Sequence, residues 1–380
     1  IIAISIGGML GSGIFVLPGI AAGQTGSSIW LADLCAAILI IPAVLSKSEL
    51  ATALPKSGGA YIYIERAFGP LFGTISGLGL WASLLLKSSF ALVGLGYYFD
   101  ILVTNTGINT QLLTLGFLLI IVILNILGVK KVGKVQLGIV IISLLGLLSI
   151  FILGFSNQTI ENNNSFFING NYGLISTIAF VYMSYAGVTK IAAIAGEVKN
   201  PNKNLPIAML SSLLIISVIY VGISYTLVNT ISTDLLENNY NPLFTLAEIL
   251  GGHNFGMIIA AIGVITLFSM ANSGMLATSR FPFAMAVDKL LPSQLAKVHS
   301  KFLTPVNTII LTAIIMSLVI TQIKVVEIVK LASAFKVLMF ILVNLSVIIL
   351  RETAVQWYVP KYKSPLYPYI QLFGVFSGFI

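Results

Sequence analysis

Four glycines fall close together in the first apolar segment of the chain, at Gly7, Gly8, Gly11 and Gly13. Each glycine inside a helix costs about 1 kcal/mol relative to alanine, so this stretch predicts a helix that unwinds. Unwound backbone at membrane depth is tolerated only where protein buries it or where it lines a wet cavity. Its free N–H groups can bind an anion, and its free carbonyls can bind a cation. The glycine stretch is therefore a candidate binding site.

A second interruption lies in the sixth apolar segment, at Ser184–Lys190, which reads Ser-Tyr-Ala-Gly-Val-Thr-Lys. A single glycine with polar neighbours is a weak signal, but its position corresponds to that of the first break. Each break lies in the opening span of a set of five, although the two halves show no sequence repeat by eye. Paired interruptions of this kind indicate a transporter site built from inverted repeats. The topology predicts a 5+5 inverted-repeat transporter fold with broken helices 1 and 6.

Three lysines lie inside apolar segments, at Lys87, Lys190 and Lys336. An ionisable residue at bilayer depth costs several kcal/mol and usually faces the bundle interior. No acid is evident at mid-membrane, because Asp33 and Glu327 lie near the outer ends of their spans. Each lysine is therefore neutral, or is paired with a bound anion or with backbone carbonyls. We expect Lys190 to act in proton coupling or substrate-charge recognition; the alternative is a structural cation that hydrogen-bonds broken-helix carbonyls.

The elements that position these residues are membrane-spanning helices. Of the 380 residues, 57% are hydrophobic and 8% are charged, which predicts an all-α polytopic membrane protein. The single cysteine, Cys35, excludes an intramolecular disulfide. We expect one transmembrane domain over residues 1–380, truncated at both ends, with repeats at about 1–155 and 172–350. Apolar runs long enough to span lie at about 1–22, 28–46, 71–103, 110–128, 134–155, 172–195, 205–230, 254–283, 304–323 and 328–350, and part of an eleventh begins near 367.

Basic residues fall almost entirely on one side of this topology, which places the N-terminus in the cytoplasm. The opposite side has Lys324 alone, so the net charge of +8 reflects loop cations and indicates no nucleic-acid partner. The segment from Ser48 to Pro70 predicts a helix end, a Gly58-Gly59 turn and a short amphipathic helix on the cytoplasmic side. The cytoplasmic cations are Lys47, Lys56, Arg66, Lys130, Lys131, Lys134, Lys199, Lys203, Arg280, Lys289, Lys297, Lys301, Arg351, Lys361 and Lys363.

Four ordered motifs resemble those of amino acid permeases of the amino acid–polyamine–organocation superfamily. The resemblance covers most of the chain and implies a five-plus-five fold that moves amino acids by alternating access. The region Trp81–Tyr97 looks like a bacterial branch of this family, which implies a location in the inner membrane. The motifs are Gly11–Phe15, Glu49–Ala51 with Pro55–Tyr61, Glu197–Pro201 with Asn204–Pro206, and Ala277–Arg280 with Ala284–Asp288 and Leu291-Pro292.

Carried over by motif, the two breaks are the positions that bind the backbone of an amino acid. The substrate carboxylate is expected at N–H groups around Ser12 and Gly13, and the ammonium at carbonyls near Met9, Met183 and Ala186. The alternative for the glycines is close helix packing through small residues. The expected substrate-binding residues are Met9, Gly11, Ser12, Gly13, Met183, Tyr185, Ala186 and Gly187.

An aromatic residue near the second break gates the outer side of the substrate in this family. Phe180, Tyr182 and Tyr185 are the candidates, and Tyr185 is preferred because it adjoins the break. The alternative for each is packing against lipid or the core.

The coupling ion is expected to be a proton or sodium, with no other cofactor and no metal. Some proton-coupled relatives place a lysine in the fifth span, where this chain has Ser143. The family's sodium position lies between the first and eighth helices, where hydroxyls of Thr266, Ser269 and Ser273 are available. We expect Lys87, Lys190 and Lys336 to influence coupling or specificity. Their positive charge favours neutral or acidic amino acids over cationic ones.

We expect a secondary transporter of amino acids, working as a proton symporter or an exchanger in the lipid bilayer; the oligomeric state is left open. A non-transporting sensor on the same scaffold is the alternative, and a counterflow assay separates the two. The chain contains no His-Glu-x-x-His motif and no Gly-x-Ser-x-Gly motif set in a strand–helix turn, so no enzyme is expected.

Overall fold

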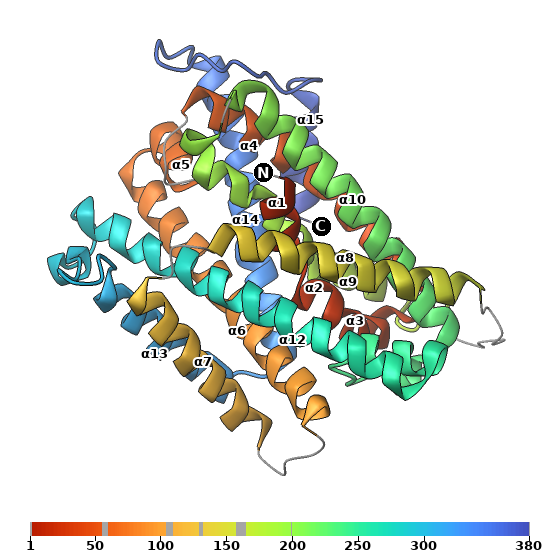
Figure 1. Cartoon of the computed structure of the whole chain (residues 1–380). Coiled ribbons are helices and arrows are strands. Elements are labelled where there is room, and N and C mark those ends of the chain that lie inside the picture. The colour runs from red at the N-terminus through yellow and green to blue at the C-terminus, as the bar shows by residue number, and fades with distance from the viewer. Residues whose placement is uncertain are drawn as a thin grey trace.

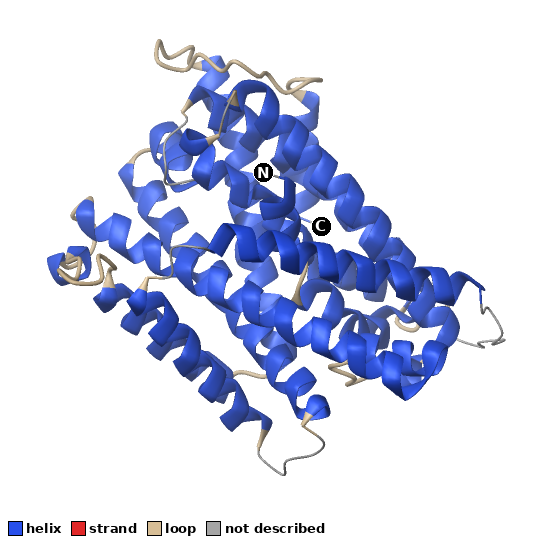
Figure 2. Cartoon of the chain, viewed as in Figure 1, coloured by secondary structure: helices blue, strands red, loops and turns tan. Residues whose placement is uncertain are grey.

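The computed structural model describes residues 2–54, 60–103, 109–128, 132–156, 165–198 and 200–379. The regular elements of these residues are all helices (Figure 2). The described part of the chain contains eight helices long and apolar enough to cross a membrane. The predicted all-α polytopic membrane protein is confirmed.

The first expected break is present, and it divides the first span into three short helices. α1 (Ile2–Met9) ends before Leu10 and Gly11, α2 covers Ser12–Phe15, and α3 covers Leu17–Thr25. Gly11 has a φ of +144°, a backbone conformation that residues with a side chain rarely adopt. A Cβ atom at Gly11 would also overlap the side chain of Met270. The break therefore requires glycine at this position.

The second break is a change of helix type. α9 (Gly170–Tyr185) is an α-helix, and the chain continues as the 3₁₀-helix η2 over Ala186–Glu197. A 3₁₀-helix of this length is uncommon, because its hydrogen-bond geometry is poorer than that of an α-helix. The interruption predicted at Ser184–Lys190 therefore begins where α9 ends.

The remaining elements follow the predicted spans, with boundaries shifted by a few residues. The short helix expected on the cytoplasmic side is α5. The predicted Gly58-Gly59 turn lies outside the described residues. The same holds for Lys56, Lys130, Lys131 and Lys199 and for the side chains of Lys134 and Glu197. The bounds are η1 Gly26–Ser28, α4 Ile29–Ala53, α5 Ala60–Phe68, α6 Pro70–Leu102, α7 Thr110–Leu127, α8 Val132–Ser156, α10 Pro201–Thr230, α11 Thr233–Leu236, α12 Pro242–Val287, η3 Ser293–Ala296, α13 Val306–Gln322, α14 Val325–Glu352, α15 Tyr369–Phe376 and η4 Ser377–Phe379.

α12 is longer than the predicted eighth span because it joins two helices across a kink. Gly252 at the kink has a non-helical backbone with φ 79° and ψ 174°. The predicted span at about 254–283 is the part that follows this kink.

The broken helices lie at the centre of the bundle (Figure 1). α1 packs against η2, α8 and α10, and α2 contacts α6, α9 and α12. α7 and α13 lie side by side at the edge of the molecule, and α15 packs against α4 and α14 (Figure 1). Helices far apart in the sequence thus surround both breaks.

Candidate substrate-binding site

The two breaks touch through their backbones. A Cβ atom on Gly187 would overlap the carbonyl group of Gly8, and one on Gly13 would lie 2.7 Å from the Cβ atom of Ser184. The Ser184 hydroxyl donates to the carbonyl oxygen of Gly13 at 3.4 Å. The Ser5 hydroxyl donates to the carbonyl oxygen of Val188, within the second break, at 3.2 Å. The glycines therefore combine both expected features: an unwound backbone and a close approach of the two helices.

Lys87 on α6 joins the two breaks. Its side chain is 5% exposed, and its Nζ atom donates to the carbonyl oxygens of Met183 at 3.0 Å and Gly8 at 3.4 Å. The role of Lys190, whether in coupling or as a structural cation on broken-helix carbonyls, stays a prediction. Among the described residues, these carbonyl contacts belong to Lys87, which comes from a different helix.

The other carbonyls expected to bind the substrate ammonium also accept hydrogen bonds from the chain. The hydroxyl of Tyr220 on α10 donates to the carbonyl oxygen of Met9 at 2.8 Å. The hydroxyl of Thr189 donates to that of Ala186 at 3.2 Å. The three carbonyls predicted to bind the ammonium therefore all accept hydrogen bonds from side chains of the protein itself. The sequence contains no signal for Tyr220, which is one of several aromatic residues in an apolar span.

The N–H group of Ser12, which was predicted to bind the substrate carboxylate, contacts a weaker hydrogen-bond acceptor. The backbone N–H of Ser12 donates to the Sδ atom of Met270 at 3.3 Å, and the Ser12 hydroxyl lies 3.7 Å from the same sulfur. A thioether is a weak hydrogen-bond acceptor. A carboxylate that displaced Met270 would therefore form stronger hydrogen bonds at this position. Met270 on α12 was not predicted, because methionine in an apolar helix is usually a core residue.

Two further lysines of the interior are buried beside these helices. Lys336 on α14 is 4% exposed, and its Nζ atom lies 5.1 Å from the ring centroid of Phe340. Lys47 is 5% exposed, because α4 continues beyond the predicted end of its span to Ala53 and Lys47 lies within the helix. Its place on the cytoplasmic side stays a prediction. Lys190 on η2 is partly buried.

The expected gate residue, Tyr185, is buried against a second tyrosine. Its ring centroid lies 5.2 Å from that of Tyr220, and its hydroxyl has no hydrogen-bond partner among the described residues. Phe180 is also buried, and the ring of Tyr182 contacts Phe340 at 5.8 Å. The gating role of Tyr185 stays a prediction.

Two of the residues assigned to different coupling ions form one contact between α8 and α12. The hydroxyls of Ser143 and Thr266 lie 2.6 Å apart, and that of Thr266 also donates to the Ile262 carbonyl at 2.6 Å. The Ser273 hydroxyl donates to the Met270 carbonyl at 3.1 Å, and Ser269 is partly buried. The ion-binding roles of these residues stay predictions.

The predicted motif residue Glu49 anchors the end of α4. Its carboxylate is fully buried and forms an ion pair with Arg351 of α14, at 2.7 Å from Nε and 2.6 Å from Nη2. It also accepts from the Tyr358 hydroxyl at 2.9 Å and from the backbone N–H and hydroxyl of Ser364 at 2.7 and 2.6 Å. The motif therefore encodes a structural contact that the sequence did not reveal.

The second part of the same motif contacts the last of the four motifs. The hydroxyl of Tyr61 on α5 donates to the carboxylate of Asp288, which follows α12, at 3.0 Å. Burial and this hydrogen bond raise the pKa of Tyr61 above its ordinary value. The hydroxyl therefore stays protonated and keeps donating at physiological pH.

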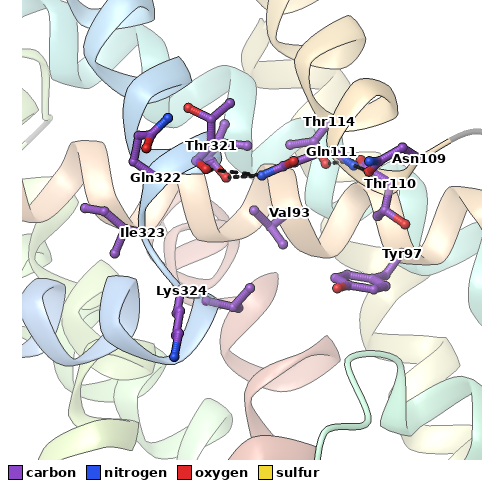
Figure 3. A pocket seen from close by; sticks show the side chains of 12 residues that line it. Val93, Tyr97, Asn109, Thr110, Gln111, Thr114, Thr321, Gln322, Ile323 and Lys324 are labelled. Atoms are coloured by element: carbon purple, nitrogen blue, oxygen red, sulfur yellow. Dashed lines mark hydrogen bonds between the residues drawn. The ribbon is translucent and has the colours of Figure 1, made fainter.

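A cavity of about 410 Å³ lies away from the breaks, between the end of α6 and the α13–α14 connection. Figure 3 shows its polar lining, including Gln111, whose amide donates to the carbonyl oxygens of Ile320 at 3.2 Å and Thr321 at 3.4 Å. None of the substrate-binding residues predicted from the sequence line it. This cavity and the predicted site are thus different places.

The fold and the two touching breaks define an integral membrane protein with discontinuous central helices, the architecture expected of a transporter. The chain belongs to the amino acid permease family, because the model of that family matches residues 1–380. The family resemblance inferred from the four motifs is confirmed.

Three curated relatives illustrate this membership. The serine/threonine exchanger SteT of Bacillus subtilis is 31% identical over 98% of this chain and 87% of its own length. The branched-chain amino acid permease BcaP of the same species is 28% identical over 92% of this chain and 79% of its own length. BcaP of Lactococcus lactis is 26% identical over 98% of this chain and 85% of its own length. These relatives are transporters and not enzymes.

Proposed function

We propose that this chain is an alternating-access secondary transporter of neutral or acidic amino acids. The observation that supports this proposal most directly is the backbone contact between the breaks, at Gly8 and Gly187. We propose inverted repeats over residues 1–155 and 172–350, and a bacterial inner membrane location with the N-terminus in the cytoplasm. The names of the relatives, a serine/threonine exchanger and two branched-chain permeases, support an amino acid as substrate.

The proposed binding step exchanges internal hydrogen bonds for bonds to substrate. The carboxylate displaces the Met270 thioether from the N–H group of Ser12 and also accepts from the N–H group of Gly13. The ammonium takes carbonyls at Met9, Met183 and Ala186, after side-chain donors such as Lys87 have moved aside. Each exchange replaces one hydrogen bond by another, so binding and release can be nearly balanced in free energy.

We propose that transport is proton-coupled or an exchange, with Lys190 as the residue that responds to pH. The Nζ atom of Lys190 has no hydrogen-bond acceptor among the described residues, unlike that of Lys87. Sodium at Thr266, Ser269 and Ser273 is the competing proposal. Replacing sodium by choline in the transport buffer distinguishes the two proposals, because amino acid uptake should stop only if it is coupled to sodium.

The experiment that tests the function is counterflow in proteoliposomes. The protein carrying this chain is reconstituted, loaded with an unlabelled amino acid and diluted into labelled amino acid, with and without a pH gradient. A panel of neutral, acidic and cationic amino acids should show exchange for the first two groups. Binding without exchange would identify a sensor on the same scaffold, and exchange of cationic amino acids alone would contradict the proposed substrate class.

A further inference from the structure

The amino group of Lys87 lies where the ammonium group of a bound amino acid is expected. The side chain is buried, and its Nζ atom donates to the carbonyl oxygens of Met183 at 3.0 Å and Gly8 at 3.4 Å. The end of a lysine side chain is a primary amine, the same donor group as the α-amino group of an amino acid. Two N–H donors are present on this amine whether or not it is charged. The contact therefore fills the position in either protonation state.

The other two carbonyls expected to bind the ammonium are also occupied by buried side chains. The hydroxyl of Tyr220 donates to the Met9 carbonyl oxygen at 2.8 Å, and that of Thr189 donates to the Ala186 carbonyl oxygen at 3.2 Å. A ligand ammonium that takes these acceptors leaves the displaced donors to find new partners inside the protein. A buried donor without an acceptor is costly. An incoming ammonium therefore competes with the protein's own donors.

The N–H group expected to bind the substrate carboxylate is in the opposite situation. The Ser12 N–H donates to the Sδ atom of Met270 at 3.3 Å, and a thioether is a weak acceptor. A carboxylate forms stronger, charge-assisted hydrogen bonds with such a group. Of the two charged groups of an amino acid, the carboxylate is thus the one for which the protein supplies only a poor substitute.

The filled and the poorly filled positions adjoin. Met183, whose carbonyl binds Lys87, is followed by Ser184, and the Ser184 hydroxyl donates to the carbonyl oxygen of Gly13 at 3.4 Å. Gly13 is the second residue of α2, the helix that begins at Ser12. α6, which carries Lys87, contacts both α2 and α12. One small ligand at the breaks therefore lies beside both positions.

We infer that the site also takes carboxylates without an α-ammonium group, of the α-hydroxy acid class, with Lys87 in place of the missing amine. This inference rests on the proposed function, because it uses the same two breaks. A carboxylate at Ser12 leaves the hydrogen bonds of Lys87, Tyr220 and Thr189 intact. A charged Lys87 has three donors, of which the described carbonyls accept two, so the third can reach an oxygen of the acid. Lys87 is then a residue that determines specificity between the two classes of carboxylate.

Matched pairs of ligands test this inference on the wild-type protein. Alanine is paired with lactate, valine with α-hydroxyisovalerate, and aspartate with malate, because each pair differs at the amino group. Thermal unfolding of the purified protein is measured with each compound. At least one hydroxy acid should raise the unfolding midpoint, at a concentration within about tenfold of that needed for its amino acid partner. If no hydroxy acid raises the midpoint, the inference is wrong.

Lys87→Met tests the part assigned to the amine. The carbonyls of Met183 and Gly8 then lack a donor unless the ligand brings one. The half-saturating concentration of the hydroxy acid should rise about tenfold relative to that of its amino acid partner, the effect of about one hydrogen bond. This ratio is insensitive to a general loss of stability. Lys330→Met removes an exposed lysine and should keep the wild-type ratio, and an unchanged ratio in Lys87→Met would overturn the inference.

A small amine should rescue the shortened side chain. In Lys87→Ala, methylammonium in the buffer can donate to the two carbonyls and should restore the effect of the hydroxy acid. Tetramethylammonium has no N–H group and should not restore it; equal effects of the two cations would contradict the role of Lys87 as a donor. The wild-type measurement needs no variant, and it remains the deciding test if the Lys87 variants do not fold.

Transport separates this inference from the proposed function. Proteoliposomes loaded with an exchanged amino acid should also take up its labelled hydroxy acid partner. If amino acids are exchanged and no hydroxy acid binds, the inference fails and the proposed function stands. If no amino acid is exchanged but a hydroxy acid raises the unfolding midpoint in a Lys87-dependent way, the proposed function fails and the carboxylate site stands.

Discussion

The hydroxyl of Tyr220 on α10 lies 2.8 Å from the carbonyl oxygen of Met9, the last residue of α1. This carbonyl is at the edge of the first break, where helical hydrogen bonding stops. The tyrosine therefore satisfies an acceptor that the glycine-induced break leaves free. The hydrogen bond also connects the broken helix to a continuous one.

Removal of this hydroxyl should destabilise the empty site more than the occupied one. In Tyr220→Phe the buried Met9 carbonyl loses a donor, at about 1 kcal/mol. The unfolding midpoint without substrate should fall, and a transported amino acid should raise it by more than in the wild type. Tyr225→Phe is the control, because this exposed tyrosine lies on the same helix. If the amino acid raises the unfolding midpoint of Tyr220→Phe by less than that of the wild type, the Met9 carbonyl does not belong to the substrate site.

A larger residue at Gly13 should abolish uptake while the protein still reaches the membrane. A Cβ atom there lies 2.7 Å from Cβ and 3.0 Å from Cα of Ser184, so Gly13→Val forces the two breaks apart. Gly116→Val is the matched control, because a Cβ atom at Gly116 has no neighbour within 4 Å. Uptake and membrane content are measured in the same cells. Normal uptake by Gly13→Val would exclude Gly13 from the substrate site.

Lys190→Met should remove the pH dependence of uptake. In a proton symporter, uptake rises when the outside pH is lowered below the inside pH, and methionine cannot carry the proton. Uptake by proteoliposomes is measured across a range of outside pH, with Lys330→Met as an exposed-lysine control. Wild-type pH dependence in Lys190→Met would end the assignment of Lys190 to coupling.

Glu49→Gln should destabilise the protein strongly. It leaves the charge of Arg351, whose side chain is 17% exposed, without its buried partner. Breaking a buried ion pair by removing one member costs on the order of 3 kcal/mol. Thermal unfolding in detergent measures the loss, and Glu327→Gln, an exposed acid of α14, should lower stability by less than about 1 kcal/mol. Equal effects of the two variants would show that the Glu49 ion pair contributes little.

The sequence predicts those features that depend on local backbone chemistry. Gly11 unwinds the first span, and the second span with an interruption changes from α9 to η2 next to Gly187. The boundary of α4 was predicted less well, because hydropathy falls where Lys47 and Glu49 begin although the helix continues. Polar residues at the end of a buried helix resemble a loop when only composition is considered.

Contacts between distant helices could not be predicted from such patterns. The order of the spans places both Lys87 and Lys190 near broken-helix carbonyls. Only the packing of α6 brings the Nζ atom of Lys87 within hydrogen-bond distance of the Met183 carbonyl oxygen. Met270 is a further example, because its contact with Ser12 depends on the rotation of α12. These contacts follow from tertiary geometry, whereas the breaks follow from the sequence.

The contact between Glu49 and Arg351 restricts how the bundle can deform. α4 and the end of α14 cannot part at this point without exposing a buried ion pair, so we expect them to move together. Ser364 binds the same carboxylate and should move with these two helices. α4 contains Pro42, which lacks the N–H needed for a helical hydrogen bond. If the bundle opens near Glu49, α4 should therefore bend at Pro42, and the part of the helix from Pro42 to Glu49 should move together with the end of α14.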